Sequence, residues 1–260
     1  MKELSSLLAP VTKSNILIRV SYDGTRYLGW QKTAAGATIQ GTLENVLQIA
    51  LQEPIQVEAA SRTDAGVHAL AQAANFFTTR PVKDLEKLRL NLNKLLPKDI
   101  AITEIAQVPT NFHPTLDNLG KLYGYYICHS PIQMPIHRNF SWHYPYPLDL
   151  SNMKKAALHF LGEKDFSALL SQKNEHFYKD CVRDIWAIDV VQLENERVVI
   201  YVKGRSFLYK MVRTLVGTLV YVGCGKITPD AIPEILLSGE RARAGITAPP
   251  HGLFLKEVCY

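Results

Sequence analysis

The chain has 260 residues, and its apolar pattern predicts the same order of elements in each half. In the first half, residues 15–22 alternate apolar and polar side chains, as expected for a strand. A helix that Thr38 can cap follows, and then two strand-like runs. A second helix, with leucine at every third or fourth position, must end near Pro97, and residues 100–108 predict a closing strand. The order strand, helix, strand, strand, helix, strand is typical of a ferredoxin-like sheet with helices on one face.

The second half repeats this order loosely. Residues 121–130 predict a strand, and Ser151 is expected to cap a helix that carries apolar residues up to Phe160. Residues 185–193 and 197–204 predict two strands joined by a short acidic turn. Two more helices and a final strand at the carboxyl end complete the pattern.

The repeated order predicts an α+β (mixed α/β) chain of two ferredoxin-like, RRM-like βαββαβ domains. We expect an N-terminal tail over 1–14, a first domain over 15–111 and a second over 112–260. Their antiparallel sheets are expected to face each other across a basic cleft, which is a natural place for a functional site.

Composition narrows the class of protein. The hydrophobic share of 47% and the charged share of 20% are ordinary for a soluble globular protein with a sizeable core. The net charge of +5 suits a phosphate-bearing partner without requiring one. The first residues do not resemble a secretory signal, and the most apolar stretch is too short to cross a membrane. Four widely spaced cysteines lack zinc-site spacing, so reduced thiols in a cytoplasm are expected.

Asp64 is the only acidic residue between Glu58 and Asp84. A carboxylate there can serve as a nucleophile or a general base, or it can be a plain surface charge paired with Arg62. Gly66 follows it closely, and glycine accepts the positive φ of a sharp turn and leaves the approach open. The stretch therefore suits a reactive carboxylate, although composition alone leaves the surface pair open.

Arg213 lies beside the apolar face of the helix predicted after Phe207. Gly217, one turn further on, leaves room for another segment to approach. A guanidinium held against a core needs an anionic partner, because its isolated burial is costly. Asp64 from the other half is the candidate partner, and the alternative is that Arg213 reaches water along its aliphatic stem.

Tyr123 shares a strand face with Tyr125. An aromatic ring in a basic cleft can stack on a displaced nucleobase, although an ordinary sheet tyrosine is the alternative. Basic residues gather loosely in three places, which is weak support for a nucleic-acid partner. They are Arg19, Arg26 and Lys32, then Lys203, Arg205 and Lys210, then Arg241 and Arg243.

Together these segments resemble the tRNA pseudouridine synthase A family. SYDGTRYLGWQ at 21–31 is similar to that family's opening motif, and SRTDAGVHA at 61–69 is similar to its catalytic motif. DFSAL at 165–169, FLYKMVRTLVGTL at 207–219 and APPHGLFLKEVCY at 248–260 resemble its C-terminal motifs. The matches span nearly the whole chain in the family's order.

The resemblance implies roles for single residues. Asp64 would be the catalytic aspartate, Arg213 the basic residue that pairs with it, and Tyr123 the active-site tyrosine near the uracil. Leu253 would pack around the site, and Arg62 would handle the flipped-out base. Two further residues, Arg205 and Lys210, are candidates for substrate binding.

The resemblance also implies a reaction and its partners. The family's members are homodimers that bind tRNA across both subunits, and they isomerise uridine at positions 38, 39 and 40 of the anticodon stem-loop. The reaction exchanges no electrons and uses no energy carrier, so no cofactor and no metal are expected.

One stretch departs from the family pattern. Where the family has a run similar to FHARFSA, this chain has FHPTLDNLG at 112–120. Pro114 and Thr115 replace a small residue and an arginine, and Asp117 and Asn118 replace a serine and an alanine. We expect this to alter substrate range and affinity more than the chemistry.

Two other functions fit the sequence less well. The chain could be a tRNA-binding module or tRNA chaperone without catalysis, and the departing stretch is the only support for that. It could also be a hydrolase that uses Asp64 and His68, although the closeness of these residues makes such a site awkward.

Overall fold

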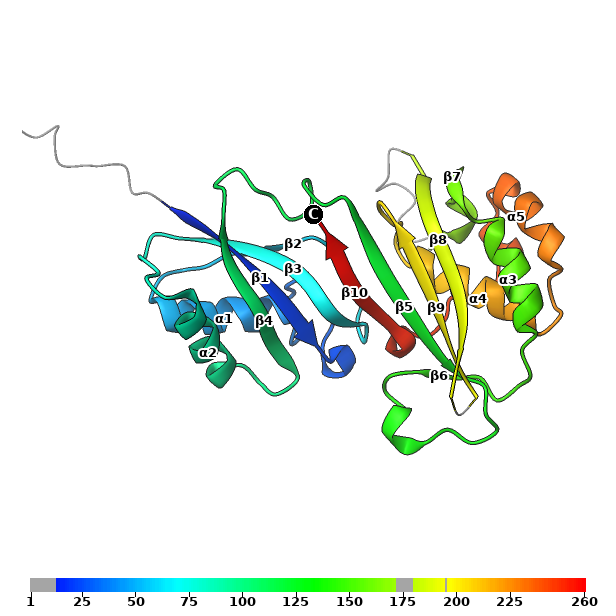
Figure 1. The fold of residues 1–260 in the computed structure, drawn as a ribbon, viewed down its shortest axis with the longest axis horizontal. Helices are drawn as coiled ribbons and strands as arrows, with labels where there is room; N and C mark the ends of the chain where they lie inside the picture. The colour runs from blue at the N-terminus through cyan, green and yellow to red at the C-terminus, as the bar shows by residue number, and fades with distance from the viewer. Residues whose placement is uncertain (1–12, 172–179, 195) are drawn as a thin grey trace, which may run out of the picture.

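A computed structural model describes residues 13–171, 180–194 and 196–260 of the protein (Figure 1). The first half of the chain has the expected order of elements. Its elements are β1 (Ser14–Tyr22), α1 (Ile39–Leu51), β2 (Val57–Ala59), β3 (His68–Thr78), α2 (Leu85–Leu95) and β4 (Ile100–Val108). In the sheet the strands lie in the order β4-β1-β3-β2 with antiparallel neighbours, as in a ferredoxin-like unit.

The second half repeats that unit with additions. The repeated elements are β5 (Gly120–Cys128), α3 (Leu150–Leu158), β8 (Val182–Leu193), β9 (Arg197–Gly204), α4 (Met211–Gly223) and β10 (Leu253–Cys259). Their order in the sheet, β10-β5-β9-β8, matches β4-β1-β3-β2 of the first half. Short strands β6 (Trp142–His143) and β7 (Gly162–Asp165) and helix α5 (Ile232–Ser238) are inserted between them.

The mixed α/β class is confirmed, but the halves do not form two separate sheets that face each other. Strand β10 joins them into one sheet, as Figure 1 shows by the red arrow between β3 and β5. It pairs in parallel with the start of β3, Phe254 opposite His68, and antiparallel with β5. This joint is possible because β2 pairs only with the far end of β3, through Val57 and Phe76, so the start of β3 is left for another strand.

Side-chain caps fix where the helices begin. The hydroxyl of Thr38 accepts a hydrogen bond from the Gly41 N–H at 3.2 Å, as expected. The expected cap of α3 at Ser151 is wrong. Asp149 takes that position and accepts a bond from the Asn152 N–H at 2.9 Å, and a carboxylate also suits the positive end of the helix.

The core lies between the sheet and the helices, with α1 behind β4 and β1 and α4 behind β9 and β8 in Figure 1. Ile16 and Ile18 of β1 are fully buried, as is Leu43 of α1. Nearly every residue of α4 is buried, which explains why its sequence is apolar on most sides. Burial of each large aliphatic side chain in this core contributes about 1.5–3 kcal/mol to the free energy of unfolding, relative to leaving the side chain exposed.

The ends and linkers of the chain differ slightly from expectation. Residues 1–12 of the expected tail lie outside the described residues, and Ser14 already belongs to β1. The departing stretch 112–120 connects β4 to β5. Among the helices that the structure describes, none combines the length and the apolar character that a membrane crossing requires.

Candidate active site

Asp64 lies in the loop between β2 and β3, and backbone hydrogen bonds fix that loop. The Trp30 N–H donates to the Thr63 carbonyl at 3.0 Å, and the Gly66 N–H donates to the Tyr27 carbonyl at 3.3 Å. Gly66 has a φ of +77°, which is the left-handed conformation that glycine adopts without strain. These contacts hold Asp64 in one place.

Arg213 of α4 forms the expected ion pair with Asp64 across the two halves of the chain. Its Nη1 donates to Asp64 Oδ2 at 2.7 Å, and its Nε donates to the Ala248 carbonyl at 2.7 Å. The side chains are 11% and 19% exposed, so the pair is largely shielded from water. Arg213 therefore neither reaches out to solvent nor leaves Asp64 to pair with Arg62.

Gly217 explains how α4 can come so close. A Cβ atom on this residue would lie 1.7 Å from the Ile246 carbonyl oxygen, so no larger residue fits without a shift of the backbone. The strand-like segment that includes Ala248 thus packs directly on α4 and orients the Arg213 guanidinium.

The ion pair lines a cavity of about 960 Å³ to which both halves contribute. Its charged lining side chains are four cations and two carboxylates, which gives the cavity an excess of positive charge suited to a phosphate-bearing ligand. These residues are Arg62, Lys121, Lys210 and Arg213, together with Glu58 and Asp64.

Tyr123 and Leu253 form buried parts of this cavity and are 7% and 6% exposed. The Tyr123 hydroxyl is hydrogen-bonded to the Ser61 hydroxyl at 2.8 Å. Its ring meets the Phe207 ring edge to face with 5.2 Å between centroids. Burial raises the pKa of Tyr123 to about 12, so the phenol is neutral at physiological pH.

The other predicted substrate-binding residues divide into two groups. Arg62 and Lys210 line the cavity, and Arg62 is exposed. Lys210 precedes α4 in a left-handed conformation, with φ of +59°, which is strained for a residue with a side chain. Arg205 is exposed and is not part of the cavity lining.

Most of the basic clusters seen in the sequence lie elsewhere and have local partners. Arg26 pairs with Asp99, Lys32 pairs with Glu44, and Arg243 pairs with Glu234. The positive character of the cavity therefore comes largely from residues that those clusters did not include.

The departing stretch forms part of the cavity wall. His113 and Thr115 line the cavity, and the Thr115 hydroxyl donates to the Ala59 carbonyl at 2.8 Å. His113 Nε2 lies 3.4 Å from Glu58 Oε2. The Asp117 carboxylate accepts the His113 N–H at 2.8 Å, so this acid serves the backbone of its own loop.

His68 does not form a catalytic pair with Asp64. It is fully buried, its Nδ1 accepts from the Gly24 N–H at 3.0 Å, and its Nε2 lies 2.8 Å from the Asn139 carbonyl. It stacks on Phe254 and is not part of the cavity lining. Burial lowers its pKa, which favours the neutral ring, so its role in the structure is to bind segments together.

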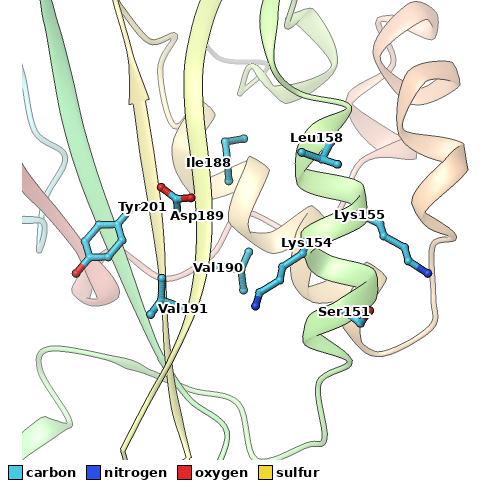
Figure 2. A pocket seen from close by; sticks show the side chains of 9 residues that line it. All are labelled: Ser151, Lys154, Lys155, Leu158, Ile188, Asp189, Val190, Val191 and Tyr201. Atoms are coloured by element: carbon cyan, nitrogen blue, oxygen red, sulfur yellow. The ribbon is translucent and has the colours of Figure 1, made fainter.

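A second hollow, of about 570 Å³, lies at α3, β8 and β9 (Figure 2). Its chemistry is sparse, because Asp189 faces no partner acid or histidine in the lining, and the cations are the lysines of α3. In the part of the chain that the structure describes, no three histidine, cysteine or acidic side chains gather as a metal site. The Asp64 cavity is therefore the candidate active site.

Two of its members, Lys121 and Phe207, were not predicted as site residues. Lys121 could have been found by the same alternation that placed Tyr123, since it lies two residues earlier on the same strand and so on the same face. Phe207 carried no comparable signal, because an apolar residue before a helix is usually part of the core.

Comparison with known proteins places this chain in a class. A family model described as tRNA pseudouridine synthase matches residues 18–117 and 156–260. The chain therefore belongs to the tRNA pseudouridine synthase family, as the motifs predicted, and it is an isomerase of that class.

Individual relatives are similar over almost their whole length. A tRNA pseudouridine synthase A 2 of Protochlamydia amoebophila is 48% identical over 256 residues, which cover 98% of each chain. A tRNA pseudouridine synthase A of Geotalea uraniireducens is 44% identical over 94% of this chain and 99% of its own. One from Thermoanaerobacter pseudethanolicus is 41% identical over 95% and 99%.

Proposed function

We propose that the protein converts uridine to pseudouridine at positions 38, 39 and 40 of the tRNA anticodon stem-loop, with Asp64 as the catalytic carboxylate. The observation that carries this proposal is the ion pair between Asp64 and Arg213 in a positively charged cavity, within a chain of this family. The size of the cavity, about 960 Å³, suits a nucleotide that has left its helix.

The reaction defines what Asp64 has to do. The N1–C1′ bond breaks, the uracil turns, and a C5–C1′ bond forms while C5 loses its proton, so no electrons are gained or lost. The target base must first leave the stack, which costs a few kcal/mol. The Asp64 carboxylate then acts either at C1′, to form a covalent sugar adduct, or on the neighbouring ribose proton, to form a glycal.

The surrounding residues orient the Asp64 carboxylate and bind the target nucleotide. The two hydrogen bonds of Arg213 aim its guanidinium, so the Asp64 carboxylate is held in a fixed direction. Tyr123 stacks on the uracil, and its neutral hydroxyl can relay the C5 proton only by passing its own proton on to water at the same time. Leu253 packs against the ring. Arg62 and Lys210 contact phosphates at the opening, and Arg205 contacts RNA beyond the cavity.

The assembly and setting belong to the same proposal. We expect a cytoplasmic homodimer that binds one tRNA across both subunits, with domains over 15–111 and 112–260. Within the described residues, Cys128, Cys224 and Cys259 are free thiols, in line with a reducing compartment.

The decisive experiment uses tRNA labelled with tritium at uridine C5. Release of the label by the wild-type protein demonstrates synthase activity, and sequencing of the product locates the modified uridines. Binding of tRNA without tritium release would favour a tRNA-binding module without catalysis. Modification at positions other than 38, 39 and 40 would show that the proposed substrate positions are wrong.

A further inference from the structure

Lys121 of β5 is a cation in the cavity whose role the reaction described above does not include. It lines the cavity and is only 9% exposed. Among the residues that the structure describes, none forms a hydrogen bond or an ion pair with its ammonium group. The other buried cation of the cavity, Arg213, is satisfied by Asp64 and a carbonyl.

A lysine that is largely shielded from water and whose ammonium group has no partner is unfavourable, so its place in the cavity lining calls for an anion that arrives later. Burial lowers the pKa of Lys121 to about 8, and the group still carries its proton at neutral pH. No carboxylate of the described residues lies close enough to Lys121 to neutralise this charge, so the charge is available to a ligand.

The position of Lys121 favours the base over the phosphates. It lies two residues before Tyr123 on the same face of β5, and this spacing is about 6.5 Å along a strand, close to the width of a pyrimidine ring. Arg62 is exposed, and Lys210 is more exposed than Lys121. When a nucleotide enters base first, its phosphates stay near the exposed cations and its base reaches the buried ones.

We propose that the Lys121 ammonium group contacts a carbonyl oxygen of the target uracil and stabilises the negative charge that the base carries after N1–C1′ cleavage. When this bond breaks, its electron pair stays on N1 and spreads over the ring to the carbonyl oxygens. Lys121 keeps its proton throughout, and the charge disappears when C5 attacks C1′. This role rests on the proposed reaction, and it makes Lys121 a catalytic residue of an oxyanion-stabilising type.

The test compares Lys121→Met, Lys121→Gln and Lys121→Arg with the wild-type protein. Single-turnover rates are measured at saturating tRNA that carries either uridine or 5-fluorouridine at the target position. Fluorine withdraws electrons and stabilises the negative charge on the departing uracil. A cation beside the uracil therefore contributes less to the rate of cleavage. We expect the Met and Gln variants to break the uridine glycosidic bond about 10²–10³-fold more slowly. With 5-fluorouridine the loss should be at least about tenfold smaller, and Lys121→Arg should retain most of the rate.

Binding and folding measurements separate this role from its alternatives. The dissociation constant for tRNA should stay within about twofold of wild type at each salt concentration, because the neutral variants lose no phosphate contact. A weaker, less salt-dependent binding with a normal single-turnover rate would overturn the proposal and assign Lys121 to a phosphate. Equal slowing on both substrates by folded variants would also overturn it. Wild-type turnover of uridine, measured first, tests the proposed function separately.

Discussion

The loop between β2 and β3 and the hairpin between β8 and β9 occupy equivalent places in the two repeated units, yet they are built differently. Strands β8 and β9 pair from Ile185 to Leu193 and join through a short turn. Strand β2 pairs with β3 through only three residues, and the loop at 60–67 carries Asp64. In this place the second unit has the twelve-residue strand β8, and the first unit has only the three-residue strand β2.

The difference shows how a repeated fold gains a site. The short β2 leaves the start of β3 free, and β10 pairs there and ties the two halves together. The same shortening gives the loop at 60–67 the length to reach Arg213 of the other half. The ion pair of Asp64 with Arg213 and the joint between the halves thus both depend on the short pairing of β2 with β3.

The largest expected effect comes from Asp64→Asn. Because the amide can neither attack nor accept a proton as a carboxylate does, we expect tritium release to fall by on the order of 10³-fold or more, equivalent to about 4 kcal/mol. Binding of tRNA, measured by filter retention, should largely persist. The matched change in the equivalent hairpin, Glu194→Gln, should leave the rate within about twofold. Near-normal tritium release by Asp64→Asn would contradict the proposal that the loop between β2 and β3, unlike the hairpin between β8 and β9, carries a residue that the reaction requires.

The next effect comes from Arg213→Ala. It strands a shielded carboxylate, so we expect a loss of about 3 kcal/mol in the free energy of unfolding and a much lower rate of isomerisation. The control is Arg243→Ala, which breaks the more exposed pair with Glu234 and should cost less than about 1 kcal/mol. Urea titration measures the free energy of unfolding of both variants. Equal losses would contradict the claim that the shielded pair of Asp64 and Arg213 stabilises the fold more than the exposed pair of Arg243 and Glu234.

A pH effect of moderate size is expected at the joint itself. Burial lowers the pKa of His68 below its ordinary value, so the folded state prefers the neutral ring. Its contribution is complete above about pH 6.5 and is lost as the pH falls through the folded-state pKa, with a slope of up to about 1.4 kcal/mol per pH unit. His251 lies nearby with its pKa lowered in the same direction and adds to the slope.

Urea titrations between pH 7.5 and 5 compare the wild-type protein with His68→Gln. The variant should lose stability less steeply with acid, although it is less stable overall. Identical slopes would show that His68 is not the group whose burial holds β3 to its neighbours.

The smallest effect is expected from Ser61→Ala. The hydroxyl of Ser61 orients that of Tyr123, and a single hydrogen bond of this kind contributes about 0.5–1.5 kcal/mol. We expect kcat to fall about two- to tenfold with KM nearly unchanged, and Ser61→Thr should restore part of the loss. An effect on KM alone would assign Ser61 to substrate binding.

The sequence revealed local features well and long-range pairing poorly. Alternation and helical periodicity predicted both βαββαβ units, because those patterns reflect which face of each element is buried. The pairing of β10 with β3 was missed, because no local pattern tells a strand which distant partner it takes. The cap of α3 was misassigned because Ser151 and Asp149 are both good capping residues, and only the structure distinguishes them.

The site shows the same division. Asp64, Tyr123 and Arg213 were found from an isolated charge, a family motif and a cation beside an apolar face. Lys121 was missed, because a lysine on a strand usually lies at the surface, although it shares a face of β5 with Tyr123. The cavity that it lines takes residues from both halves, and no local pattern reveals that assembly.

A double-mutant cycle on Asp64→Ala and Arg213→Ala, measured by the free energy of unfolding, tests most directly whether the two halves are coupled through this pair. The account predicts that the losses from the two single variants together exceed the loss from the double variant by about 1–3 kcal/mol. Strictly additive losses would contradict it, because they would mean that the carboxylate and the guanidinium do not depend on each other.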